Sequence, residues 1–275
     1  MTDKAYVAGV GMVPFQKPGK SESYDVMATA ATRSALADAG LDYDKVQQAY
    51  VGYVYGDSTC GQRALYHVGM TGIPVLNVNN NCSTGSSALF LARQAVESGA
   101  VECALALGFE QMQPGAIGAM FHDRVSPFAA FDSETDDLVG RSEIPLALRY
   151  FGGAGKAHMD EFGTPLETFA KIRAKASRHA AKNPVALFRQ EVTAEDVMAA
   201  QVVWPGVMTK LMACPPTCGA AAAIICSKEF ADKHGLDSSV RIAAQAMTTD
   251  GPETFEAHDM REVVGFSMAK RAADQ

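Results

Sequence analysis

Cys82 is the residue whose type and position most clearly suggest chemistry. It stands in NVNNNCSTGSSALFLARQ, between an expected buried strand at 73–79 and an expected helix at 83–99. The N-terminal end of a helix presents unpaired N–H groups and a partial positive charge, which favour a thiolate and stabilise an oxyanion. The small residues after Cys82 would let a substrate approach the backbone. The alternative, an inert thiol in the core, is the usual state of a free cysteine.

The other cysteines and the histidines match no metal-site pattern. Cys214 and Cys218 form a C-x-x-x-C pair, but no second pair and no nearby histidine completes a zinc ligand set. The six histidines show no His-x-x-x-His spacing. Cys103 and Cys226 fall in apolar strands, so we expect them in the core. The sequence therefore predicts no metal site.

Alternating strands and helices surround Cys82 and would position it. Short apolar runs bounded by glycine or proline predict strands, and longer runs with apolar residues at helical spacing predict helices. The expected strands lie at 5–15, 48–56, 73–79 and 101–109, with helices between them at 24–42, 59–72 and 83–99. Because strands alternate with helices, the pattern predicts an α/β protein with a mostly parallel sheet.

The pattern changes between about residues 110 and 211. Glycines and prolines are scattered there, and the acidic segment 132–137 is expected to be a solvated loop. An excursion of about a hundred residues is longer than an ordinary loop, which indicates an insertion. The remaining expected elements are helices at 163–182 and 193–203, a strand and helix within 219–235, a strand at 239–249 and the beginning of a helix at 258–275.

Charge and hydropathy exclude several classes of partner. The formal net charge is -7 and the 24 basic residues form no run, so we predict no nucleic-acid surface. The longest apolar stretches, such as 219–226, fall well short of the roughly 20 residues that cross a bilayer, so no membrane span is expected. The first residues lack the pattern of a secretory signal, and the cysteines are expected to be thiols in a reducing compartment.

A long part of the sequence resembles the sterol carrier protein type of the thiolase superfamily. The resemblance is carried by VGYVYGDSTCGQRALYHVGMTGIPVLNVNNNCSTGSSALFLARQAVESGAVECALALGFEQM and continues in FGGAGKAHMDEFGT, CPPTCGAAAAI and MREVVGFSMAKRAA. It implies a thiolase-like fold whose N-terminal βαβαβαβ half carries a helical lid. The implied domains are an N-terminal domain at 1–110 and 211–238, the lid at 111–210 and the beginning of a C-terminal domain at 239–275.

The resemblance also implies roles for individual residues. In the family, the cysteine that matches Cys82 attacks the carbonyl of an acyl-CoA or 3-oxoacyl-CoA and becomes an S-acyl enzyme. His158 and Met159 match a pair in the lid that faces the thioester and the pantetheine arm, and the turn that contains Cys214 borders the cleft for coenzyme A. Coenzyme A is then a substrate, and no metal or other cofactor is needed. The family forms homodimers by pairing the third strands of two subunits.

Two functional hypotheses follow. The first is a thiolase-type acyltransferase that acts on 3-oxoacyl-CoA or acetyl-CoA in fatty acid or sterol side-chain degradation, in the cytoplasm of a bacterium or the peroxisome of a eukaryote. Family motifs that supply a later histidine and a second cysteine do not occur between Val240 and Gln275. The 275-residue chain by itself is therefore expected to be acylated slowly at best, without turnover. The second hypothesis is a noncatalytic thiolase-like protein that dimerises or binds acyl-CoA.

Overall fold

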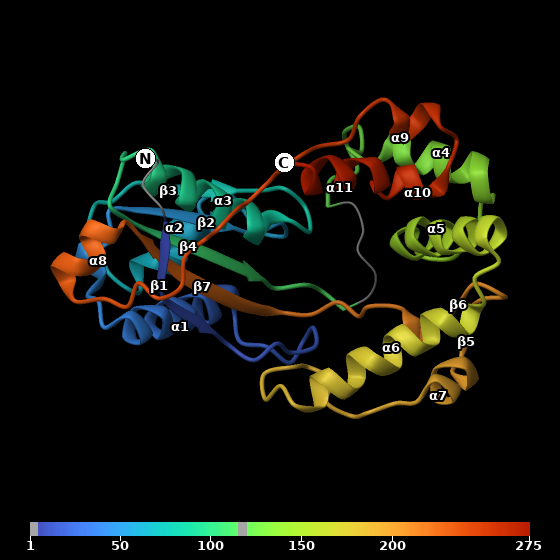
Figure 1. Ribbon diagram of the computed structural model, residues 1–275, viewed down its shortest axis with the longest axis horizontal. Helices are drawn as coiled ribbons and strands as arrows, with labels where there is room; N and C mark the ends of the chain where they lie inside the picture. The colour runs from blue at the N-terminus through green and yellow to red at the C-terminus, as the bar shows by residue number, and fades with distance from the viewer. Residues whose placement is uncertain (1–4, 115–119) are drawn as a thin grey trace. The chain divides into compact units, whose positions relative to one another are not determined.

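The computed structural model describes residues 5–114 and 120–275, which form two compact units (Figure 1). The first unit contains the described residues up to Pro114 together with Pro216–Gln245, and the second contains the described part of 115–215 together with Ala246–Gln275. The expected domains at 1–110 with 211–238, at 111–210 and at 239–275 include residues outside the described ranges and stay predictions.

A mixed five-stranded sheet forms the centre of the first unit, in the order β1-β7-β4-β2-β3. Its strands are β1 (Tyr6–Met12), β2 (Gln48–Gly52), β3 (Val75–Val78), β4 (Cys103–Glu110) and β7 (Gly219–Cys226). Strand β2 pairs in parallel with both β3 and β4, whereas β7 is antiparallel to both β4 and β1. Four strands therefore run in one direction, as the alternating pattern predicted, and only β7 runs in the other.

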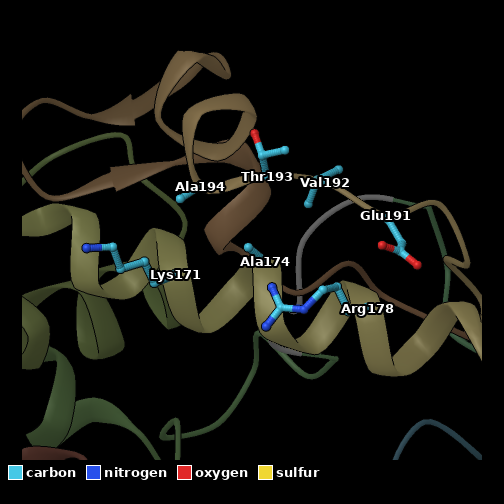
Figure 2. Close-up of a pocket in the computed structure, with 7 residues that line it drawn as sticks. All are labelled: Lys171, Ala174, Arg178, Glu191, Val192, Thr193 and Ala194. Atoms are coloured by element: carbon cyan, nitrogen blue, oxygen red, sulfur yellow. The ribbon is translucent and has the colours of Figure 1, made fainter.

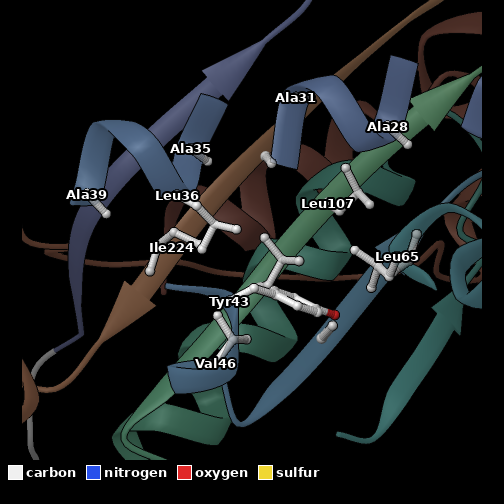
Figure 3. Packing of buried hydrophobic residues seen from close by; sticks show 14 of the residues in the cluster. Ala28, Ala31, Ala35, Leu36, Ala39, Tyr43, Val46, Leu65, Leu107 and Ile224 are labelled. Atoms are coloured by element: carbon white, nitrogen blue, oxygen red, sulfur yellow. The ribbon is translucent and has the colours of Figure 1, made fainter. Parts of the chain in front are cut away.

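Helices cover both faces of this sheet because successive strand residues point to opposite sides. Leu105 and Leu107 of β4 pack on one face with α1 (Tyr24–Ala39) and α2 (Cys60–Tyr66), as Figure 3 shows for Leu107. Ala104 and Ala106 pack on the opposite face with α3 (Thr84–Glu97). The order β1-α1-β2-α2-β3-α3-β4 confirms the predicted βαβαβαβ arrangement. A short 3-10 helix, η1 (Tyr43–Lys45), precedes β2, and α8 (Lys228–His234) follows β7.

The prediction of a strand at 239–249 is wrong. In this segment only residues 240–242 pair with the chain at β1: the Val7 N–H donates to the Val240 carbonyl (2.9 Å), and the Ile242 N–H donates to the Ala5 carbonyl (2.9 Å). Tyr6 and Arg241 form an isolated bridge between these two bonds. No further pairing of this segment is found within the described residues, and from Ala246 onward the chain belongs to the second unit.

The second unit is mostly helical and contains two helices that the sequence pattern missed, α4 and α5. Its helices are α4 (Ala129–Val139), α5 (Leu146–Phe162), α6 (Leu166–Ala181), α7 (Ala194–Ala199), α9 (Glu253–Glu256), α10 (Met260–Val263), α11 (Phe266–Ala273) and the 3-10 helix η2 (Lys210–Met212). A two-stranded sheet joins β5 (Val202–Trp204) to β6 (Met208–Thr209). The helix at 166–181 confirms the one expected at 163–182, whereas the helix expected at 193–203 ends at Ala199 and its last two residues belong to β5.

Tertiary contacts explain why α4 and α5 are helical despite their acidic and glycine-rich sequences. The acidic segment lies within α4 instead of in a loop, and its Asp136 accepts a hydrogen bond from buried Arg149 of α5 (2.6 Å). The Arg149 guanidinium holds the pKa of Asp136 below its usual value. In α5, a Cβ added at Gly152 would lie 2.9 Å from Trp204, and one added at Gly153 would lie 2.9 Å from Met260. These glycines let large side chains pack directly on the helix backbone.

Candidate active site

Cys82 lies on the turn between β3 and α3, and its side chain is exposed. Of the six cysteines, only Cys82 and Cys214 are exposed, while the other four are buried. The structure therefore places Cys82 at the start of a fourteen-residue helix, as the sequence predicted, and not in the core. An accessible thiol beside a helix N-terminus has both the access and the local positive potential that a nucleophile requires.

Asn80 ties the turn that carries Cys82 to the first turns of α3. Its backbone N–H donates to the Thr84 hydroxyl (2.9 Å), and its side-chain amide donates to the Ser87 hydroxyl (2.9 Å). Its carbonyl accepts hydrogen bonds from both the hydroxyl (2.8 Å) and the N–H (3.1 Å) of Ser83. Asn81 adopts a left-handed φ of 46°, a conformation that asparagine tolerates better than most residues. The polar residues around Cys82 thus fix the backbone of the turn.

Gly52, which ends β2, lets α3 lie close to the sheet, whereas Gly108 of β4 leaves more room. A Cβ at Gly52 would lie 2.7 Å from the Thr84 side chain and 2.8 Å from its carbonyl oxygen. A Cβ at Gly108 would lie 3.5 Å from the Cα of Gly85, an ordinary contact. The helix start and Cys82 therefore lie at the carboxyl ends of the parallel strands, the edge where open α/β sheets commonly bind ligands.

Glu110 and Tyr55 add a charge and an aromatic ring to this edge. The Glu110 carboxylate accepts hydrogen bonds from the N–H groups of Val54 (2.9 Å), Tyr55 (3.2 Å) and Gln111 (3.3 Å). Burial raises the pKa of Tyr55, and the nearby Glu110 carboxylate raises it further. Sequence reasoning missed both residues. A carboxylate at the end of an otherwise apolar strand was the signal that could have revealed Glu110.

The buried thiols of the same unit are poor nucleophiles. Cys103 of β4 and Cys226 of β7 face each other in the sheet register and are completely buried. Burial raises the pKa of the Cys226 thiol to about 11 and raises that of Cys103 as well. Since the thiolate is the reactive form, both thiols are inert near neutral pH, which agrees with the prediction that they are core residues.

His158, Met159 and Cys214 lie in the second unit, whereas Cys82 lies in the first. His158 and Met159 are neighbours on α5; His158 is exposed with its ring 4.8 Å from that of Phe162, and Met159 is partly buried. Cys214 is exposed in the segment that follows η2. Their role as substrate contacts stays a prediction.

A surface pocket in the second unit does not have the chemistry of acyl transfer. Its volume is about 370 Å³, and Figure 2 shows it lined by side chains of α6 and of the segment that leads into α7. Lys171 on its rim is already paired with Glu167 (3.0 Å), and neither cysteine nor histidine lines it.

Within residues 5–114 and 120–275, no group of histidine, cysteine and acidic side chains is arranged to hold a metal ion. No helix in these ranges is both long and apolar enough to span a bilayer.

The fold and the exposed thiol define an α/β protein with a candidate cysteine nucleophile at the carboxyl edge of its sheet. Residues 5–199 match the family described as "Thiolase, N-terminal domain", and the chain therefore belongs to this family. This match confirms the resemblance inferred from the motifs around Cys82.

Individual relatives agree with this assignment. The chain is 50% identical over 277 residues to "Sterol carrier protein 2" of Oryctolagus cuniculus and to that of Homo sapiens, in each case over 98% of this chain and 50% of the relative. It thus spans about half the length of these relatives. It is 30% identical over 275 residues to "Benzoylsuccinyl-CoA thiolase subunit BbsB" of Thauera aromatica, over 99% of this chain and 67% of that protein. The name of the Thauera aromatica relative agrees with the family match.

A solved structure confirms the fold independently. The "Ltp2-ChsH2(DUF35) aldolase" matches with a TM-score of 0.72 over 96% of this chain and 65% of that chain. Its sequence is 20% identical, so the match concerns the thiolase-like arrangement of strands and helices alone.

Proposed function

We propose that this protein is a thiolase-type acyltransferase that forms an S-acyl intermediate on Cys82. The observation that carries the proposal is the exposed Cys82 thiol at the start of α3, in a chain of the thiolase family. Its substrates would be a 3-oxoacyl-CoA or acetyl-CoA, from fatty acid or sterol side-chain degradation. Coenzyme A would act as a substrate, and no metal or other cofactor would be required.

The geometry supports the acylation half-reaction. The Cys82 thiolate would attack the carbonyl carbon of acetyl-CoA, form a new carbon–sulfur bond and expel coenzyme A as a thiolate. With a 3-oxoacyl-CoA, attack at the 3-oxo carbon would break the bond to the α-carbon and release acetyl-CoA after protonation. N–H groups at the start of α3 are suited to stabilise the oxyanion of either tetrahedral intermediate. His158, Met159 and Cys214 are proposed to contact the acyl-CoA.

The proposed assembly is a homodimer. Within the described residues, β2 is the only strand that pairs with β3, so no strand covers its other edge. On β3 the Val75 carbonyl also accepts a hydrogen bond from the Gln62 side-chain amide (3.1 Å). Leu76 of this strand is 40% exposed. An open edge with an apolar side chain is suited to pair with a second copy. The proposed location follows the source, with peroxisomes for a eukaryotic protein and the cytoplasm for a bacterial one.

Acylation of Cys82 can be tested without the complete reaction cycle. The chain is incubated with acetyl-CoA, and acetylated residues are located by intact-mass and peptide mass spectrometry. One acetyl group is expected on the wild type, and none is expected on Cys82→Ala. Cys214→Ala, a change at the other exposed cysteine, should still carry its acetyl group on Cys82, more slowly because a proposed contact with the acyl-CoA is lost. Binding of acetyl-CoA by calorimetry without any acylation would support the noncatalytic alternative instead.

A further inference from the structure

We propose that Glu110 is a positioning residue for the Cys82 site. Its carboxylate accepts hydrogen bonds from the N–H groups of Val54 and Tyr55 and so fixes the segment that follows β2. The Tyr53 N–H joins this segment to Val78, at the end of the strand that leads to the turn carrying Cys82. The inference rests on the proposed function of Cys82. Glu110 would not touch the substrate and would act by holding the segment at Val54 and Tyr55 in place.

The hydrogen bonds of Glu110 replace a strand partner where the sheet ends. The parallel register of β2 and β4 stops at Gly52 opposite Gly108. Past this point the Tyr53 N–H still donates to the Val78 carbonyl, at 3.3 Å. The next two N–H groups, of Val54 and Tyr55, donate instead to separate oxygens of Glu110, 56 and 55 residues further along the chain. Hydrogen bonds to a charged acceptor are roughly twice as strong as neutral ones.

The segment that Glu110 holds lies next to the start of α3. Gly52, the residue before it, is in direct contact with Thr84, two residues beyond Cys82. Tyr55 in this segment is partly exposed. A released segment would therefore widen the approach to the Cys82 thiol.

Two substitutions at position 110 separate this role from general stability. Glu110→Gln keeps one carbonyl acceptor, whereas Glu110→Ala removes both. Glu102→Gln is the matched control, because Glu102 is an exposed glutamate just before the opposite end of β4. Folding of all variants is compared by urea denaturation, and Glu110→Gln keeps the test valid if Glu110→Ala does not fold.

The first measurement is amide hydrogen exchange. Exchange at Val54 and Tyr55 should accelerate by roughly tenfold or more in Glu110→Ala and by less in Glu110→Gln, because charge-assisted hydrogen bonds are lost. Exchange at Leu105 and Leu107 within β4 should stay as in the wild type. Unchanged exchange at Val54 and Tyr55 in both folded variants would overturn the inference.

The second measurement compares a bulky maleimide dye with iodoacetamide at Cys82. The ratio of the two alkylation rates should rise at least roughly threefold in Glu110→Ala, since access governs thiol reactivity. The same ratio at Cys214 and the ratio in Glu102→Gln should not change. A constant ratio at Cys82 would overturn the inference, as would an equal rise in Glu102→Gln. Neither readout needs acyl-CoA, so absence of acetylation in the wild type would contradict only the proposed function.

Discussion

The thiols of this protein differ in both accessibility and electrostatic surroundings. Cys82 is exposed beside the start of α3, whereas Cys214 is exposed in an irregular segment after η2. Burial raises the pKa of both Cys103 and Cys226, which disfavours their thiolate forms. The place of each cysteine in the fold therefore separates a candidate nucleophile, a surface thiol and inert core thiols.

This difference predicts an order of alkylation. At neutral pH, iodoacetamide should modify Cys82 about three- to tenfold faster than Cys214, because a helix N-terminus stabilises the thiolate. The four buried cysteines should react only after unfolding. Peptide mapping over a time course measures all six rates in one sample. Faster modification of Cys214 than of Cys82 would contradict the assignment of Cys82 as the nucleophile.

At the scale of elements, the position of α3 against the sheet determines where Cys82 lies. Gly52 ends β2 in tight contact with Thr84, and Gly108 of β4 lies near Gly85 with more room. Gly52 and Gly108 lie opposite each other on the adjacent parallel strands β2 and β4, yet close packing requires glycine only at Gly52. This pair therefore offers a matched test of how precisely the helix must be placed.

Gly52→Ala should destabilise the protein by about 1–3 kcal/mol, because its methyl group would overlap the backbone and side chain of Thr84. Gly108→Ala should change the free energy of unfolding by less than about 0.5 kcal/mol, since its methyl group meets only ordinary contacts. Urea denaturation measures both values. The alkylation rate of Cys82 should change in Gly52→Ala alone, because the start of α3 must shift. Equal effects of the two substitutions would show that the close approach at Gly52 is unimportant.

At the scale of the whole molecule, the chain consists of an α/β unit that carries Cys82 and a mostly helical unit that carries His158. Each unit draws on two separate stretches of sequence. The open edge of β3 belongs to the first unit and is the surface by which we propose that two copies associate.

Leu76→Lys should therefore weaken the proposed homodimer. A lysine on an edge strand opposes pairing with another strand, and the exposed position of Leu76 should let the monomer fold normally. Val202→Lys is the matched control, because Val202 is an exposed apolar residue on β5 of the other unit. Sedimentation velocity should show a dimer for the wild type and Val202→Lys, and a monomer for Leu76→Lys. A dimer that tolerates Leu76→Lys would place the interface elsewhere.

Local sequence pattern was sufficient for the α/β class, for the order of elements from β1 to β4 and for the position of Cys82 before α3. These features depend on neighbouring residues, because strand and helix periodicities and the end of a helix are visible within a short window. The thiolase family was also recognisable from the residues around Cys82, and the family match confirms it.

Tertiary structure alone decided the features that join distant residues. The acidic segment forms α4, and Arg149 of α5 binds its Asp136. Gly152 lies within α5 because Trp204 packs against the helix backbone where a side chain would otherwise stand. The expected strand at 239–249 lacked neighbours and did not form beyond a single bridge. Glu110 reaches the backbone of Val54 across 56 residues. Such contacts override local propensity because their energy comes from partners that no short stretch of sequence contains.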